Sequence, residues 1–157
     1  MPFVDPLQTA EDDGPVLALG RKYGDGPVLI AKLSDDERIP LKFLEGILLD
    51  LKGQGLLESK TGKRGGYQLN RPPSTITLGS LIRRLEGPLA PLPCASETAF
   101  KPCDECLDIE SCGTRIIMRQ VRDAISDVLD RTTLAELIRR SDAARASKLP
   151  EPLMYEI

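Results

Sequence analysis

Apolar residues recur at intervals of three and four between residues 37 and 53, the spacing that places one apolar stripe on one face of a helix. Pro40 fits the first turn of this helix, where a proline sacrifices no hydrogen bond. Gly53 and Gly55 end the helix, because glycine accepts the left-handed conformation of a helix terminus. The stripe that we expect to be buried consists of Ile39, Phe43, Leu44, Ile47, Leu48 and Leu51.

Two short extended runs follow at residues 56–59 and 67–69, separated by a glycine-rich turn that carries Lys60, Lys63 and Arg64. This pattern predicts an antiparallel hairpin. A helix followed by a basic hairpin suits double-stranded DNA, because the helix fits the major groove and a thin cationic loop reaches phosphates or the minor groove. The alternative is a solvated hairpin on any small domain.

The segments around this unit predict further helices. Residues 28–33 begin a short helix and residues 34–37 form a turn, which gives a helix-turn-helix at residues 28–52. Residues 16–23 are a candidate first helix, after a flexible segment at residues 1–15 that contains three prolines and an acidic run. Thr77 caps a helix that Gly87 and Pro88 end, with Leu78, Leu81, Ile82 and Leu85 on one face.

A long apolar stripe returns from residue 113 to 129, formed by Ile117, Val121, Ala124, Ile125 and Val128. A monomer of this size offers such a stripe little to pack against, so we expect it to pair with a second copy of the chain. The alternative is that it packs back on its own winged helix. Residues 133–136 form a capping box that opens a final short helix to about Arg140.

These elements predict a mainly α fold with a small β-wing, a winged helix-turn-helix followed by a long C-terminal dimerisation helix. The expected order is a flexible segment at 1–15, the winged domain at 16–87, a cysteine-containing loop at 88–112, the dimerisation helix and short C-terminal helix at 113–140, and a loose tail at 141–157. We call residues 88–112 the cysteine loop. A loop of this length inside a compact domain requires something to organise it.

The cysteine loop holds Cys94, Cys103, Cys106 and Cys112, the four cysteines of a chain that has no histidine. Thiolates are preferred ligands for zinc and for iron–sulfur clusters. A dithiol redox pair at Cys103 and Cys106 is less favoured, because adjacent acidic residues would raise the thiol pKa. Without histidine, few nucleophilic or zinc-dependent enzyme mechanisms are available, so we expect a protein that is not an enzyme.

Composition refines the choice of partner. Aromatic residues make up only 4% of the sequence, which speaks against stacking on single-stranded nucleic acid. The formal net charge is −3, yet residues 38–87 carry +5 while residues 1–37 and 88–157 carry −5 and −3. Local charge sets the counterion-release contribution to DNA binding, so the positive segment supports the DNA interpretation. No apolar run is long enough to span a membrane and no secretion signal is present, so we expect a cytoplasmic protein.

Within the expected DNA-binding unit, Pro40, Lys42 and Glu45 lie at the start of the central helix, on the face away from its apolar stripe. Glu45 is suited to accept a hydrogen bond from cytosine N4, and Lys42 to contact phosphate or guanine. Lys60, Lys63 and Arg64 are candidates for phosphate or minor-groove contacts. The alternative for all of these residues is a solvated surface.

The sequence also resembles a known family over residues 26–140. The resemblance rests on the segment from Ile39 and Pro40 to Leu69 with its Gly65-Gly66-Tyr67 wing, on the Ile76-Thr77-Leu78 helix start, on Glu86-Gly87 and on the downstream cysteines. In these features the chain is similar to the Rrf2 family of winged-helix transcriptional regulators, of the IscR and NsrR type.

The resemblance implies a homodimer that binds double-stranded DNA under the control of an iron–sulfur cluster. Cluster-bearing members have three cysteines in this loop, and the last two correspond to Cys106 and Cys112. Either Cys94 or Cys103 matches the first position, and Arg115 stands where one subgroup has a histidine, so the fourth ligand could be the extra cysteine. The resemblance leaves a two-iron or a four-iron cluster open, and zinc or no metal remains the alternative.

Overall fold

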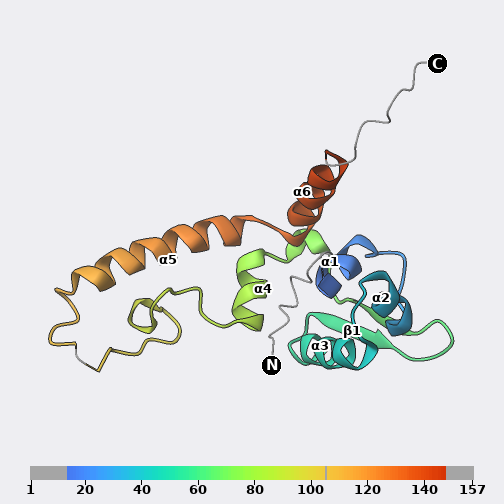
Figure 1. Ribbon diagram of the computed structural model, residues 1–157, viewed down its shortest axis with the longest axis horizontal. Coiled ribbons are helices and arrows are strands. Elements are labelled where there is room, and N and C mark those ends of the chain that lie inside the picture. The colour runs from blue at the N-terminus through green and yellow to red at the C-terminus, as the bar shows by residue number, and fades with distance from the viewer. Residues whose placement is uncertain (1–13, 105, 148–157) are drawn as a thin grey trace, which may run out of the picture.

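The computed structural model describes residues 14–104 and 106–147, and this part of the chain forms six α-helices and one two-stranded antiparallel sheet (Figure 1). The winged domain gathers at one side, and a long helix extends away from it (Figure 1). The predicted fold class, mainly α with a small wing, is confirmed. No helix among the described residues is long and apolar enough to cross a membrane.

The helix-turn-helix consists of α2 (Ile30–Asp36) and α3 (Leu41–Gly53). Leu44, Leu48 and Leu51 are fully buried on one face of α3, as their spacing predicts. The expected burial of Phe43 is wrong, because this side chain is 42% exposed. Its position lies about 100° around the helix from Leu44, which places it at the edge of the buried face.

The turn between these helices lies later than predicted. Ser34 and Asp36 still belong to α2, and Arg38 takes the left-handed conformation with φ of 51°. The Ser34 hydroxyl donates to the carbonyl of Ile39 at 2.6 Å, and the Ile39 amide donates to the Ser34 carbonyl at 3.1 Å. These bonds close the turn over residues 37–40. Pro40 therefore stands at the N-cap of α3, and its carbonyl accepts from the Leu44 amide at 3.0 Å.

The wing consists of β1 (Leu57–Lys60) and β2 (Gly66–Leu69), with Leu57 opposite Leu69 and Lys60 opposite Gly66. A short bridge adds Val28 to this hairpin through two backbone bonds with Tyr67 of 2.8 and 2.9 Å. Gly66 has a φ of 145°, and a Cβ there would lie 2.2 Å from the Val28 carbonyl oxygen. The close approach of the two backbones explains why the wing requires glycine at this position.

The first helix, α1 (Gly14–Arg21), begins earlier than the predicted start at Val16, and its residues 14–20 are buried. It packs against β2 and against α6 (Leu134–Ala146), where a Cβ on Gly20 would lie 2.7 Å from Ile138. The prediction that α6 ends near Arg140 is wrong, since the helix continues to Ala146. The flexible segment predicted at residues 1–15 and the loose tail predicted at 141–157 otherwise lie outside the described residues, at 1–13 and 148–157.

The winged domain continues through a 3-10 turn, Pro73–Thr75, into α4 (Leu78–Leu85). The Thr77 hydroxyl caps α4 by accepting from the Ser80 amide at 3.2 Å, as predicted. The cysteine loop follows and contains a 3-10 turn, Pro93–Ala95, that the sequence did not predict. It leads into α5 (Gly113–Arg131), the long helix that extends away from the winged domain in Figure 1.

Candidate nucleic-acid interface and cysteine site

The outer face of α3 presents the residues that the sequence assigned to DNA. Pro40, Lys42 and Glu45 are all exposed, and they lie beside Leu41, which is 45% exposed. Within the part of the chain that the structure describes, Lys42 and Glu45 form no ion pair. Polar groups without protein partners at the start of a recognition helix are available for base edges and phosphates.

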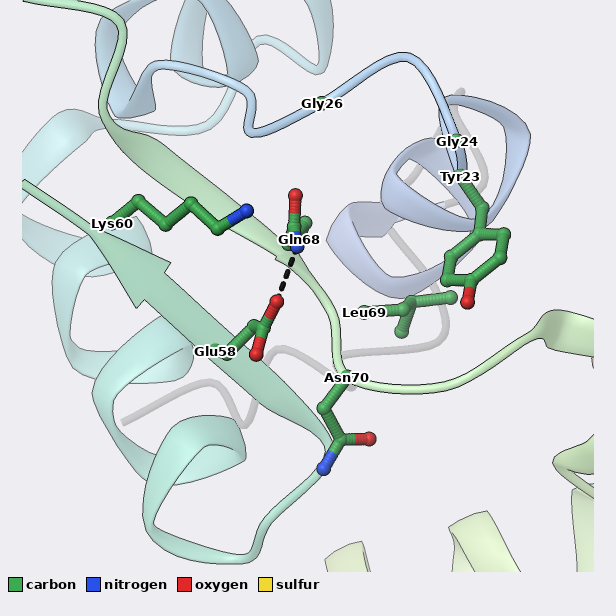
Figure 2. A pocket seen from close by; sticks show the side chains of 8 residues that line it. All are labelled: Tyr23, Gly24, Gly26, Glu58, Lys60, Gln68, Leu69 and Asn70. Atoms are coloured by element: carbon green, nitrogen blue, oxygen red, sulfur yellow. Dashed lines mark hydrogen bonds between the residues drawn. The ribbon is translucent and has the colours of Figure 1, made fainter.

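The three wing cations fall into two groups. Lys63 and Arg64 are exposed in the turn between the strands. Lys60 lies at the end of β1 and lines a shallow polar pocket of about 330 Å³ (Figure 2). In Figure 2 its side chain extends toward Gln68, which donates a hydrogen bond to Glu58 on the neighbouring strand. The structure therefore separates Lys60 from the two cations of the turn.

None of the four cysteines forms a disulfide. Cys103 is exposed and the other three are half-buried. The pKa of the Cys106 thiol is raised above its ordinary value, first by desolvation, next by hydrogen bonding with Cys103, and then by electrostatic interaction with Cys103, Cys112 and Cys94. The backbone supports the first of these contacts, because the Cys106 amide donates to the Cys103 carbonyl at 3.1 Å.

The thiols are nevertheless not in a ligand arrangement. Across residues 14–104 and 106–147, no three Cys, Asp or Glu side chains stand close enough together to hold a metal ion as they are. The donor set itself suits a soft metal, because four thiols lie in one loop and none is committed to a disulfide. A bound metal or cluster would have to draw the loop inward.

Two arginines of α5 hold the loop, and sequence reasoning missed both. Arg115 donates from Nε to the Cys94 carbonyl at 2.9 Å and from Nη1 to the Ile109 carbonyl at 3.4 Å. Arg122 is only 8% exposed and donates to the Ala95 carbonyl at 2.7 Å. In the sequence, Arg115 stands out only because it lies three residues after Cys112, where one subgroup of the family has a histidine. Nothing in the sequence indicates that these side chains reach backbone carbonyls 21 and 27 residues upstream.

The cysteine loop is connected to α3 through α5 and α4. Arg83 of α4 binds both carboxylate oxygens of Asp130 of α5, at 2.6 and 2.9 Å. The next residue, Arg84, donates to the carbonyl of Gln54, the C-cap of α3, at 2.7 Å. Arg83 and Arg84 of α4 thus contact α5 on one side and the C-terminal end of α3 on the other.

The apolar stripe of α5 remains largely uncovered. Ile116, Ile117 and Val121 are 46%, 52% and 38% exposed, and Val128 is 66% exposed. The helix contacts α4 and the 3-10 turn of the cysteine loop. The alternative in which this stripe packs on its own winged helix does not agree with these exposures.

Comparison with known proteins places this architecture in a family. Residues 15–140 match the Rrf2 family, described as iron-dependent transcriptional regulators. An rrf2-like helix-turn-helix regulator of Rhodobacter capsulatus is 36% identical over 79% of this chain and 83% of its own length. The regulator CymR of Bacillus subtilis is 33% identical over 81% of this chain and 83% of its own length. IscR of Yersinia enterocolitica is 32% identical over 75% and 68% of the two chains.

Solved structures give the same result. CymR, named as the global cysteine regulator of B. subtilis, is similar with a TM-score of 0.64 and 30% identity over 80% of this chain and 88% of its own. IscR of T. potens is similar with a TM-score of 0.61 and 27% identity over 89% and 87% of the two chains. These relatives are transcriptional regulators, in agreement with the expectation of a protein that is not an enzyme.

Proposed function

The chain belongs to the Rrf2 family of transcriptional regulators, and from this premise we propose that it is a cytoplasmic, homodimeric regulator whose binding to double-stranded DNA depends on an iron–sulfur cluster held by the cysteine loop. The observation that carries this proposal is a loop with four free cysteines that Arg115 fixes to α5, the helix that bears the uncovered apolar stripe.

DNA binding is assigned to α3 and the wing. Lys42 and Glu45 occupy the exposed start of α3, where recognition helices contact base edges. Lys63 and Arg64 in the wing turn supply positive charge for a neighbouring phosphate row. Lys60 is the weaker candidate, because it lies at the end of β1 and lines the polar pocket with Glu58 and Gln68, away from the turn that carries Lys63 and Arg64.

Dimerisation is assigned to α5. α5 exposes Ile117, Val121 and Val128 along its length. Contact of this apolar surface with water is unfavourable, so covering it with a partner is stabilising. A second copy of the same helix is self-complementary to this stripe, and a twofold dimer would present two α3 helices to two half-sites.

The four thiols of the cysteine loop are suitable ligands for an iron–sulfur cluster, but their positions would have to change to bind one. Cys94, Cys103, Cys106 and Cys112 would supply thiolate ligands, and the bound cluster would supply a redox-sensitive centre. The protein contributes the connection to DNA. Any movement of the loop is passed to α5 through Arg115, and α5 is joined to α4 by the pair between Arg83 and Asp130. A change of about 1.4 kcal/mol along this path alters DNA affinity tenfold.

Anaerobic purification followed by an absorption spectrum and assays of iron and acid-labile sulfide tests the cluster. We expect visible absorption, with iron and sulfide in equal amounts, and loss of both after replacement of Cys106 or Cys112 by serine. Protein that contains zinc without sulfide would contradict the iron–sulfur assignment and support the zinc alternative.

One observation favours a second candidate, a thiol redox switch without a metal. The Cys106 amide donates to the Cys103 carbonyl at 3.1 Å, so the backbone turns between these two cysteines, and a movement of the loop could bring their sulfurs within disulfide distance. One solved structure of Staphylococcus aureus CymR is described as an oxidised form. Mass spectrometry of protein exposed to mild oxidant distinguishes the candidates. The switch requires a Cys103–Cys106 disulfide that changes DNA affinity in metal-free protein.

A further inference from the structure

We infer that Arg115 is a positioning residue for the metal centre, and that it makes Cys94 the fourth ligand by fixing the two arms of the cysteine loop against the start of α5. The inference rests on the proposed metal centre and deepens it. It concerns a residue that cannot bind metal, because a guanidinium remains protonated and offers no lone pair.

Arg115 contacts both arms of the loop. Its Nε donates to the carbonyl of Cys94 on the first arm, and its Nη1 donates to the carbonyl of Ile109 on the second arm. Between these contacts the guanidinium lies over the ring of Phe100, 5.7 Å from the ring centroid. Hydrogen bonds from a charged donor are stronger than neutral ones, and the rigid fork of arginine fixes both carbonyls at once.

The consequence for the thiols is geometric. Cys106 and Cys112 flank Ile109 on the second arm, and Cys94 lies on the first arm, about twenty residues before the helix. Bringing the two arms of a flexible loop together costs conformational entropy. Because Arg115 holds the Cys94 backbone against the second arm, it lowers this entropy cost, and only the remaining movement that brings the thiols together is left to metal binding.

Arg122, two turns further along α5 than Arg115, supports the choice of Cys94 as the fourth ligand. It is 8% exposed, donates to the carbonyl of Ala95, and lies 3.3 Å from the Glu97 carboxylate. Two successive backbone carbonyls, those of Cys94 and Ala95, are thus held by two arginines of the same helix. Cys103 has no comparable anchor to α5 among the contacts described for it, and it is the exposed member of the four. Cys94 is therefore the cysteine that the fold delivers to the start of α5.

The test is anaerobic titration of the metal-free full chain with cobalt(II), whose sulfur-to-cobalt absorption reports thiolate coordination directly. Each ligating thiol releases its proton to the buffer on binding. Replacement of an outer residue that orients a metal ligand weakens metal affinity about 10–100-fold. We expect Arg115→Gln to weaken cobalt binding within this range and to lower the absorption per bound ion to that of Cys94→Ser.

The matched control is Arg119→Gln, one turn further along α5. Arg119 is exposed and forms no hydrogen bond or ion pair within residues 14–104 and 106–147, so cobalt affinity should not change. Arg115→Lys keeps the charge but cannot bridge two carbonyls, and we expect it to behave as Arg115→Gln. Full recovery by lysine would overturn the bridging role.

A double-variant cycle decides whether Arg115 acts through Cys94. Arg115→Gln should have no further effect in a Cys94→Ser background. Equal losses in both backgrounds would show that Arg115 only stabilises the fold, as would a matching fall in thermal stability of the metal-free protein. Wild-type protein without any sulfur-to-cobalt absorption would overturn the four-thiol centre itself. Normal cobalt binding in wild type and Arg115→Gln alike would overturn only the role of Arg115.

Discussion

Replacement of Gly66 by alanine tests how the wing is held in place. Gly66 has a φ of 145°, and a Cβ there would lie 2.2 Å from the carbonyl oxygen of Val28 and 2.9 Å from the amide nitrogen of Leu29. These are backbone atoms, so no side chain can rotate away to relieve the contact. The two backbones must separate, and the two bonds between Val28 and Tyr67 must lengthen or break.

The expected cost has two parts. Strain from a non-glycine residue at this φ is about 1–3 kcal/mol. Loss of two backbone hydrogen bonds adds about 1 kcal/mol each. We therefore expect Gly66→Ala to lower the free energy of unfolding by about 3–5 kcal/mol, measured by urea denaturation of the purified chain.

Gly62 provides the matched control in the same hairpin. Its φ is 111°, but a Cβ there would meet nothing within 4 Å. Gly62→Ala should therefore cost only the strain, about 1–3 kcal/mol. Equal free energies of unfolding for the two variants would show that the close approach of the Val28 and Gly66 backbones does not hold the wing in place.

Further predictions concern the interface, the dimer and one ion pair. Lys63→Ala and Arg64→Ala should each reduce the slope of log affinity against log salt by about one unit, and an unchanged slope would remove the wing turn from the interface. Val128→Asp should convert the dimer to a monomer in sedimentation while the unfolding midpoint of the winged domain is kept; a stable dimer would contradict the assignment of α5. The pKa of Asp130 is lowered from its ordinary 3.8, chiefly by its hydrogen bond with Arg83. Its contribution to stability is therefore present at neutral pH and lost as pH falls through the lowered value. Asp130→Asn should destabilise the chain by at most about 1 kcal/mol at neutral pH, with the difference vanishing in strong acid.

The winged domain could be predicted largely from sequence because its elements are specified by local patterns. The spacing of Leu44, Leu48 and Leu51 defines α3, and the glycines and cations after it define the hairpin. The predicted position of the turn before α3 was wrong, because polar residues that favour turns can also end a helix. Ser34 and Asp36 are typical of turns, yet here they complete the last turn of α2, and the Ser34 hydroxyl closes the turn that follows.

The candidate site was only partly accessible to sequence analysis. The cysteines could be identified from their chemistry and their position in an irregular loop. The arginines that hold this loop could not, because Arg115 and Arg122 act on backbone carbonyls that are distant in sequence and carry no residue signature. The same holds for Arg84, whose contact with the Gln54 carbonyl joins α4 to the end of α3. Such contacts depend on how helices pack, which apolar spacing within one helix does not specify.

The central claim is that the state of the cysteine loop determines DNA affinity. Its most direct test is the affinity of cluster-loaded and cluster-free protein for one operator, selected from random duplexes and measured anaerobically at matched salt. We expect affinities that differ at least tenfold, and a difference that disappears when Cys106 is replaced by serine. Equal affinities of the two forms for the same operator would contradict it.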